Sequence, residues 1–245
     1  MIAKRRSTSI DNRLLAALPA DDYARVALTL EVIPLQIKQY LHKPGEPLAY
    51  VYFPSGGFCS IVTVLKDGRM VEMATVGREG MIGLAAISGG RQGSTAVMVQ
   101  GRFDTCQRMA IADFDREMAR RGVFCDLLTD YTRALTGSIM QSTACNAVHS
   151  IEQRLARWLL TERDRMASSE FLLTQEFVAM MLGATRPSVT LVAGTLQKAG
   201  LITYRRGHLT ILKRGMLEDA SCECYGTTAA LMNSVTTRRE RDRGR

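Results

Sequence analysis

Residues 173–191 carry the most specific pattern of the chain, Leu173-Thr-Gln-Glu-Phe-Val-Ala-Met-Met-Leu-Gly-Ala-Thr-Arg-Pro-Ser-Val-Thr-Leu191. In a helix-turn-helix, a small residue in the first helix lets the second helix cross closely, a glycine forms the turn, and a β-branched residue anchors the second helix. Ala179, Gly183 and Val189 meet these three needs. Apolar residues also stand where the packed faces require them, at Val178, Leu182 and Val192. The stretch therefore predicts a helix-turn-helix.

The start of the second helix is specified locally. The Thr185 hydroxyl can cap a helix that begins at the next residue. Pro187 then falls in the first turn, where a missing N–H costs nothing. We therefore expect the second helix to begin directly after Thr185.

Two short apolar runs follow, Gly200-Leu-Ile-Thr-Tyr204 and His208-Leu-Thr-Ile-Leu212, and a basic turn, Arg205-Arg206-Gly207, joins them. Runs of this kind predict a β-hairpin, or wing. A helix-turn-helix with a wing offers two surfaces to DNA, because the helix can reach base edges and the wing can reach phosphates. A winged domain that makes only protein contacts is the alternative interpretation.

The strongest candidate for base contact is Arg186, because residues at the N-terminal end of a recognition helix enter the major groove first. Its planar guanidinium can bind guanine O6 and N7 together. The other candidate DNA-binding residues are polar positions of the two helices and the wing: Thr174, Gln175, Thr185, Ser188, Thr190, Lys198, Arg205 and Arg206. For Thr174, Gln175 and Lys198, an ordinary solvated surface is an equally good interpretation.

Strand-like runs occupy the first part of the chain, between about Val32 and Asp113, with turn residues between them. This spacing is typical of an antiparallel β-roll or jelly roll. The clearest hairpin joins residues 60–65 to residues 69–76 through Lys66-Asp67-Gly68, since an Asp-Gly step favours a tight turn.

A long helix is expected from Val123 to His149, which at 1.5 Å per residue spans roughly 40 Å. The large residues Phe124, Leu128, Tyr131 and Leu135 follow the 4-3-4 spacing of a packing stripe. The stripe could pack on the roll of its own chain or form a helix pair between two subunits. Because such a helix overhangs a small roll, we expect a dimerisation helix.

These patterns predict an α+β chain in three parts. Residues 1–150 would form an effector domain, which ends in the dimerisation helix at about residues 115–149. Residues 151–225 would form a winged-helix DNA-binding domain. Residues 226–245 would form a basic disordered tail. Within the second part, residues 151–166 show one apolar face and predict an amphipathic helix.

Composition narrows the class of protein. The chain has 32 basic and 24 acidic residues, a net charge of +8, which indicates an anionic partner such as double-stranded DNA. No run approaches 18 apolar residues, so we expect a soluble cytoplasmic protein with no membrane contact. His42, His149 and His208 lie in separate segments, and the sequence has no nucleophile elbow or phosphate-binding loop, so we expect no enzyme.

The helix-turn-helix stretch, with Ser150-Ile-Glu-Gln-Arg-Leu-Ala-Arg-Trp-Leu160 before it and Leu196-Gln-Lys-Ala-Gly-Leu-Ile202 after it, resembles the C-terminal part of Crp/Fnr-family transcriptional regulators. The resemblance covers nearly the whole chain. It implies that the effector domain, residues 1–150, is a cyclic-nucleotide-binding-like β-roll with a long dimerisation helix, and that the winged helix is a DNA reader. It also implies a homodimer that binds a pseudo-palindromic operator and works with RNA polymerase.

Family members that bind cyclic AMP hold the ribose with a Gly-Glu step and the phosphate with an Arg-Ser or Arg-Thr step. At the matching positions of this chain, Met81 replaces the glutamate and Gly93 replaces the arginine. The resemblance therefore argues against a cyclic nucleotide, and the sequence indicates no other cofactor. The residues that would line an effector site are Gly80, Gly83, Arg91, Ser94 and Thr95.

Six cysteines are spread over the chain without a CxxC pair, and none precedes Cys59, so the N-terminal iron–sulfur cluster of oxygen-sensing relatives is not expected. Cys222 and Cys224 form a CxC step, which could be redox-active or bind a soft metal. Without a third ligand nearby in sequence, this pair does not predict a metal site. We expect structural thiols, and a redox-responsive regulator that uses Cys222 and Cys224 stays open as an alternative function, as does an interaction module that does not bind DNA.

Overall fold

The computed structural model describes residues 10–101, 105–166 and 168–243. Two short helices, α1 (Arg13–Ala16) and α2 (Ala20–Ala27), lead into a β-roll that is interrupted by α3 (Leu84–Ile87). The strands of the roll are β1 (Leu30–Ile33), β2 (Tyr40–His42), β3 (Tyr50–Pro54), β4 (Cys59–Val64), β5 (Met70–Val76), β6 (Ala96–Val99) and β7 (Cys106–Ala110).

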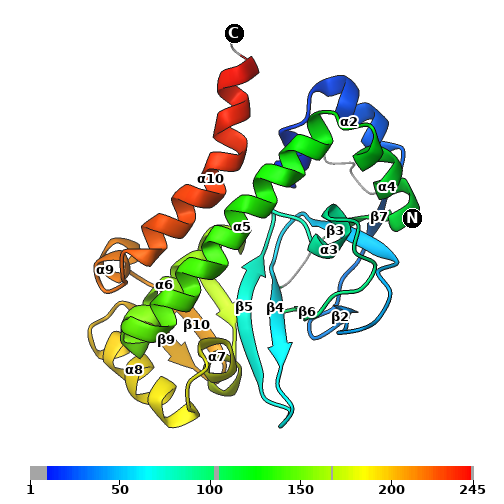
Figure 1. Ribbon diagram of the computed structural model, residues 1–245. Helices are drawn as coiled ribbons and strands as arrows, with labels where there is room; N and C mark the ends of the chain where they lie inside the picture. Colours follow the sequence, from blue (N-terminus) through cyan, green and yellow to red (C-terminus); the bar gives the residue numbers. More distant parts are fainter. Residues whose placement is uncertain (1–9, 102–104, 167, 244–245) are drawn as a thin grey trace, which may run out of the picture.

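The strands of the roll pair antiparallel in two sheets, ordered β1-β7-β3 and β2-β6-β4-β5 (Figure 1). Strands β4 and β5 form the expected hairpin, from Cys59 opposite Val76 to Val64 opposite Met70, with a shift of register between Ile61 and Val62. The expected antiparallel roll and its clearest hairpin are therefore confirmed.

After α4 (Ile111–Ala119), the 26-residue helix α5 (Val123–Val148) runs along the roll and on toward the C-terminal region (Figure 1). Its stripe of large residues faces inward, because Phe124, Leu128, Tyr131 and Leu135 are each 2% exposed or less and belong to the core of the roll. A partner subunit cannot reach these four side chains. The prediction that they make dimer contacts is therefore wrong: the 4-3-4 spacing serves the chain's own roll.

Tyr131 makes a close contact between α5 and the roll. Its hydroxyl donates a hydrogen bond to the Met81 carbonyl at 3.0 Å. The ring lies against Gly80, where a Cβ atom would stand 2.8 Å from ring carbons. The glycine thus allows a close approach of helix and loop that a larger residue would block.

The last part of the chain differs from the expected disordered tail. Helix α10 (Cys224–Arg243) packs along α5, and its residues Met232 and Val235 are buried in the core of the roll. Apolar residues at helical spacing, with Leu231 reaching to 3.3 Å from the Cβ position of Gly137, order this segment despite its polar composition. The two final residues of the predicted tail, 244–245, lie outside the described residues.

The C-terminal region has the elements of a winged helix: α6 (Ile151–Met166), β8 (Glu170–Leu172), α7 (Gln175–Leu182), α8 (Arg186–Lys198), β9 (Ile202–Arg205), β10 (His208–Ile211) and α9 (Arg214–Asp219). Strand β8 adds a third strand to the wing, in the order β8-β10-β9. This region has a second apolar core, which also takes in Phe58, Val62 and Ala96 of the roll. The domain boundaries near residues 150 and 225 stay a prediction.

A buried polar network ties α6 to strand β5. Thr75 donates to Glu162 Oε1 at 2.6 Å, and Arg165 lies between the carboxylates of Glu79 (2.8 Å) and Glu162 (3.1 Å). Glu72 accepts hydrogen bonds from Trp158 Nε1 at 2.8 Å and from Ser60 Oγ at 2.6 Å. Glu162 and Thr75 are buried, and buried polar groups are costly when they are separated from their partners, so the network holds α6 in one position against the roll.

Among the residues that the structure describes, no single helix has the length and apolar character needed to cross a membrane. Helices α7 and α8 meet that test only when they are taken together, across a bend of 105°.

The Tyr131–Gly80 contact predicts a stability effect. Gly80→Ala forces a Cβ atom into the Tyr131 ring and should lower the free energy of unfolding by about 1–3 kcal/mol, the usual range for overpacking. Gly56→Ala is the matched control, because a Cβ atom at Gly56 meets nothing within 4 Å. Urea unfolding of both variants measures the difference. Equal stability of the two variants would contradict the contact.

The carboxyls of Glu72 and Glu162 predict a pH effect. Burial, with the Glu162 charge adding to it, raises the pKa of Glu72 to about 8, and burial raises the pKa of Glu162 to about 7. Both values exceed the unfolded value of about 4.3, so the folded state holds these protons more tightly, and this stabilisation is lost as the pH rises toward 8. We expect the free energy of unfolding to fall between pH about 5 and about 8.

The matching substitution is Glu72→Gln, which removes the titrating group and should flatten the pH dependence of urea unfolding. Glu170→Gln, at an exposed position of β8, serves as the control and should leave the slope as in the wild type. A slope that is unchanged in Glu72→Gln would show that this carboxyl ionises in the folded protein as it does in the unfolded chain.

Candidate nucleic-acid interface

Helix α7 begins and ends as its sequence requires. Thr174 caps it, with its hydroxyl accepting from the Phe177 N–H at 3.1 Å. Gly183 ends it with φ +57°, a left-handed conformation that favours glycine. The next helix leaves at 105°, within the range of a helix-turn-helix.

Helix α8 begins at Arg186, directly after its cap, as expected. The Thr185 hydroxyl accepts from the Ser188 N–H at 3.4 Å and lies 2.8 Å from the Ser188 hydroxyl. Pro187 stands in the first turn, where no hydrogen bond is lost. The cap therefore fixes how the first turn of α8 presents its side chains.

The inner faces of the two helices are apolar and hold α8 in place. Val178, Ala179 and Leu182 of α7 and Val189 of α8 are buried, while Val192 is half-buried. Trp158 of α6 packs edge-on against Phe177, and the Arg154 guanidinium donates to the Leu182 carbonyl at the turn. Helix α8 thus rests on a rigid base formed by α6 and α7.

The outer face carries the predicted polar residues, and several of them are brought together. Thr190 donates to Gln175 Oε1 at 2.7 Å and to the Arg186 carbonyl at 2.9 Å, so Gln175 of α7 is tied to α8. The Arg186 side chain is exposed and forms no hydrogen bond or ion pair with any residue that the structure describes. A guanidinium without an internal partner is free to bind an external acceptor.

Lys198 lies apart from this group. It is twelve residues after Arg186 on the same helix, roughly 18 Å away along the axis. Lys198 is exposed at the last turn of α8 and therefore cannot share a base contact with Arg186.

The wing is anchored at the entry to α7. The Leu173 N–H donates to the Gly207 carbonyl at 2.7 Å, and the Tyr204 hydroxyl donates to the Leu173 carbonyl at 2.9 Å. Arg205 and Arg206 stand exposed at the tip of the β9–β10 hairpin. The two hydrogen bonds to Leu173 therefore fix the wing, and with it the two arginines, relative to the helix-turn-helix.

One exposed residue of α8 escaped the prediction, which considered only polar side chains. Leu191 is 74% exposed, next to Thr190 on the outward face. Apolar side chains contact the thymine methyl group in the major groove. The signal was present in the helical spacing, because Leu191 falls outside the buried stripe of Val189, Ala193 and Leu196.

The five predicted effector residues are not brought together at one site, unlike the polar residues of α7 and α8. Gly80 packs against Tyr131, and Gly83 starts α3. The Arg91 guanidinium forms an ion pair with Asp115 at 2.8 Å, on the surface. Ser94 is exposed and Thr95 is half-buried, so both stay predictions. Met81, which stands where a ribose-binding glutamate is expected, is fully buried.

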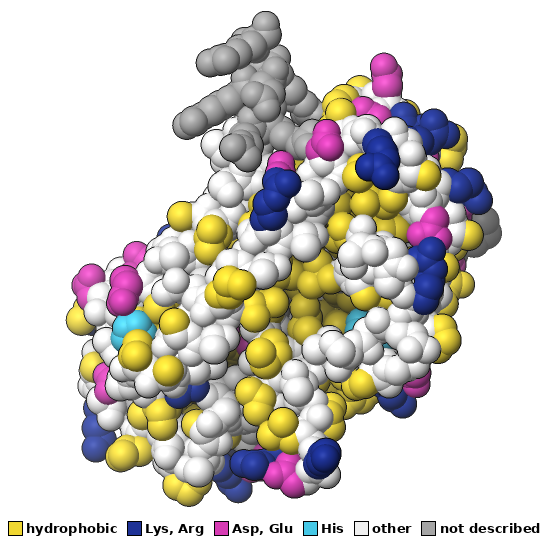
Figure 2. All heavy atoms as spheres, in the orientation of Figure 1, with side chains coloured by type: hydrophobic (Ala, Val, Ile, Leu, Met, Phe, Trp, Pro, Cys, Tyr) yellow, Lys and Arg dark blue, Asp and Glu magenta, His cyan; other side chains and the backbone are white. Residues whose placement is uncertain are grey.

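Figure 2 shows a hollow in the roll beside β4, lined mostly by hydrophobic side chains, while Lys and Arg are scattered over the rest of this face. A separate cavity of about 130 Å³ lies between β5, α5, α6 and α10, and Glu72, Arg157 and Arg165 are among its lining residues. None of the five predicted effector residues lines that cavity.

The C-terminal region matches a known domain family. The model of the Crp-like helix-turn-helix domain matches residues 153–220, which run from α6 to the end of α9. No curated protein matches the chain.

Solved structures with the same fold cover most of the chain. A protein from Eubacterium rectale described as a transcriptional regulator of the Crp/Fnr family is 20% identical over 84% of this chain and 96% of its own, with a TM-score of 0.64. FixK2 from Bradyrhizobium japonicum is 18% identical over 79% of this chain and 98% of its own, with a TM-score of 0.66.

A third structure is the global regulator CLP from Xanthomonas campestris, described as responsive to c-di-GMP. It is 13% identical over 80% of this chain and 100% of its own, with a TM-score of 0.64. At these identities the similarity shows the fold. The chain thus contains a Crp-like helix-turn-helix domain at residues 153–220 and shares its overall fold with solved structures of Crp/Fnr-family regulators.

Proposed function

We propose that this chain is a transcription regulator that binds a pseudo-palindromic operator in double-stranded DNA as a homodimer. The observation that carries the proposal is Arg186, an exposed guanidinium without a partner among the described residues, at the first turn of a capped and rigidly supported helix. Helices held in this way present their N-terminal residues to the major groove.

In this proposal Arg186 binds a guanine through O6 and N7, and its neighbours set the register. Thr190 and Gln175 are already linked by a hydrogen bond, so they contact the DNA as one unit. Thr174, Thr185 and Ser188 bind phosphate at the helix starts, where backbone N–H groups also point toward an anion. Leu191 contacts a thymine methyl group.

The wing and the net charge supply attraction that does not depend on sequence. Arg205 and Arg206 at the hairpin tip, and Lys198 at the end of α8, bind phosphates on either side of the bases read by α8. The net charge of +8 favours association with DNA in general.

The dimer would form through the side of α5 that the roll and α10 leave open. Exposed residues on this side recur at helical spacing: Arg133, Thr136, Met140, Thr143 and Ala147. Two α5 helices packed along this side would set two α8 helices about 34 Å apart, one helical turn of DNA.

A signal would act through the roll, because strand β5 is tied to α6 and lies beside α7. The effector is not a cyclic nucleotide in this proposal, since Met81 is buried where a ribose ligand is needed and the hollow of the roll is lined by apolar side chains. Work in the cytoplasm, contact with RNA polymerase and the absence of an enzymatic activity belong to the same proposal.

Arg186→Ala tests the base contact. We expect operator selection from random duplexes at about 150 mM salt to give a symmetric motif with the wild-type protein. Arg186→Ala should relax one base pair in each half-site and lose about 1–3 kcal/mol for each contact. The control is Arg116→Ala, which removes the same charge from an exposed position on α4.

A motif read equally well by wild type and Arg186→Ala would overturn the assigned contact. No enrichment by a folded dimer, with or without cell extract as a source of effector, would favour the interaction module that does not bind DNA.

Arg206→Ala tests the wing. Removal of one phosphate contact should weaken binding to specific and random duplexes by the same factor and lower the slope of log K against log salt by about one. Electrophoretic or fluorescence titrations over a salt series measure both quantities. A loss confined to the specific operator would instead place Arg206 at a base edge.

A further inference from the structure

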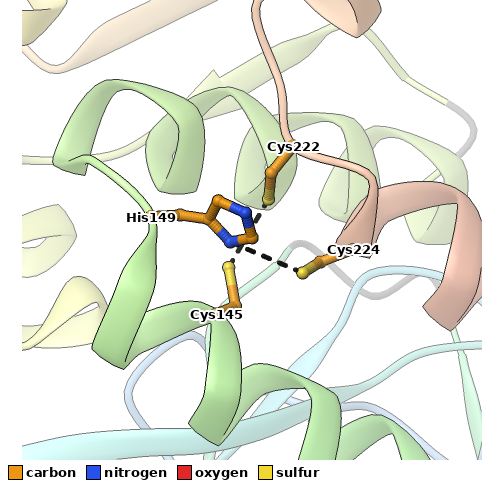
Figure 3. Close-up of side chains that lie close together, drawn as sticks. All are labelled: Cys145, His149, Cys222 and Cys224. Carbon is orange, nitrogen blue, oxygen red and sulfur yellow. Dashed lines mark hydrogen bonds between the residues drawn. The ribbon is translucent and has the colours of Figure 1, made fainter.

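Four potential metal ligands meet where α5 ends and α10 begins. Cys145 and His149 come from the last turn and C-cap of α5, and Cys222 and Cys224 come from the loop before α10 and its first residue. Figure 3 shows the three sulfur atoms and the imidazole of His149 turned toward a common centre. Segments 77 residues apart in sequence thus supply one cluster.

The spacing of the ligand atoms fits a tetrahedral ion. All four lie within 4.8 Å of one another. Cys145 Sγ is 3.5 Å from Cys222 Sγ, and Cys224 Sγ is 3.6 Å from His149 Nδ1. A tetrahedral zinc ion with Zn–S bonds of about 2.3 Å would place its sulfurs about 3.8 Å apart, so only small adjustments are needed.

The groups around the cluster are those that orient metal ligands. His149 turns Nδ1 toward the sulfurs, while its Nε2 lies 3.3 Å from a carboxylate oxygen of Glu223. Such a carboxylate fixes the tautomer in which the other nitrogen binds metal. The Gln141 amide donates to Cys224 Sγ at 3.1 Å and would support a thiolate.

The charge of the surroundings also fits. Arg154 and Arg157 of α6 are each 9% exposed and interact electrostatically with Cys145. Neither forms an ion pair with an acid in the described part of the chain, and the Nε atom of each has no hydrogen-bond partner there. Three thiolates, one neutral imidazole and one divalent cation carry a net charge of −1, which buried cations stabilise.

We infer that Cys145, His149, Cys222 and Cys224 bind one zinc-class divalent cation, which joins the C-terminal end of α5 to the start of α10. A Cys₃His set is typical of structural zinc, and it leaves no open position for substrate. The inference does not depend on the proposed DNA binding, because it concerns other residues.

The location gives the ion a structural consequence. The chain leaves the helical conformation at His149 between α5 and α6, so the cluster lies beside the junction of the long helix with the winged-helix region. An ion held by both α5 and the α9–α10 loop restricts rotation about this junction. Metal binding would thus select one orientation of the winged-helix region relative to α5.

The test uses the full-length protein, reduced and stripped with a chelator, and then titrated with Zn²⁺ or Co²⁺ in competition with a colorimetric chelator. We expect one equivalent of metal per chain. With Co²⁺ we expect the intense d–d bands of tetrahedral coordination together with a thiolate-to-metal charge-transfer band. Zn²⁺ should also raise the melting temperature of the wild type, since it binds only the folded site.

Matched variants locate the ion. Cys222→Ser and His149→Ala should lose stoichiometric binding, and Glu223→Gln should weaken it by about 10–100-fold, the usual effect of an outer-shell partner. Cys125→Ser is the control, since Cys125 lies on the same helix but outside the cluster, and it should bind as the wild type does.

Three results would overturn the inference. The first is a wild type that takes up no more Co²⁺ than Cys222→Ser. The second is a cobalt spectrum without thiolate bands, which needs no variant and is therefore independent of folding defects. The third is recovery of a Cys145–Cys222 disulfide from protein isolated under metal-replete conditions, which would make the pair a redox element instead. A wild-type protein that binds the metal but does not bind DNA would contradict only the proposed function.

Discussion

Burial of one face of α5 against the roll fixes the position of every element that follows. Tyr131 lies at the centre of this contact, with its ring against Gly80 and its hydroxyl on the Met81 carbonyl. The roll covers only the first part of the helix, and the second part extends beyond it to His149. Since a helix is stiff over this length, the roll determines where the junction with α6 lies.

Two further sets of contacts hold the winged-helix region against the roll. Arg165 is placed between Glu79 and Glu162, and the Trp158 indole donates to Glu72, so α6 has a defined rotation about its axis relative to β5. Polar groups in such a network lose most of their stabilisation if one member shifts. The contacts of α6 with Phe177 and Leu182 continue this connection from β5 to the helix-turn-helix.

Sequence reasoning succeeded where the determinants are local and failed where they are distant. The Thr185 cap, the Gly183 turn and the β4–β5 hairpin each depend on a few adjacent residues, and the structure has all three. The stripe of Phe124, Leu128, Tyr131 and Leu135 was assigned to the wrong partner, because its spacing is the same whether the opposite surface is a roll or another helix. The order of α10 was missed because it depends on Gly137 and other parts of α5, far away in sequence.

The cluster of Cys145, His149, Cys222 and Cys224 also depends on residues that are distant in sequence, and this is why the sequence alone did not predict it. The CxC step supplies two ligands, and a third and fourth appear only once α10 is folded back along α5. The turn from α5 into α6 places Arg154 and Arg157 near Cys145, and neither arginine forms an ion pair with a carboxylate in the described part of the chain. In the proposed function, a signal in the roll would reach the winged-helix region through α5 and β5, whereas the proposed ion at Cys145 and His149 would act on the junction itself. The roll therefore meets the winged-helix region directly, through β5 and α6, and the proposed ion adds a second constraint at the end of α5.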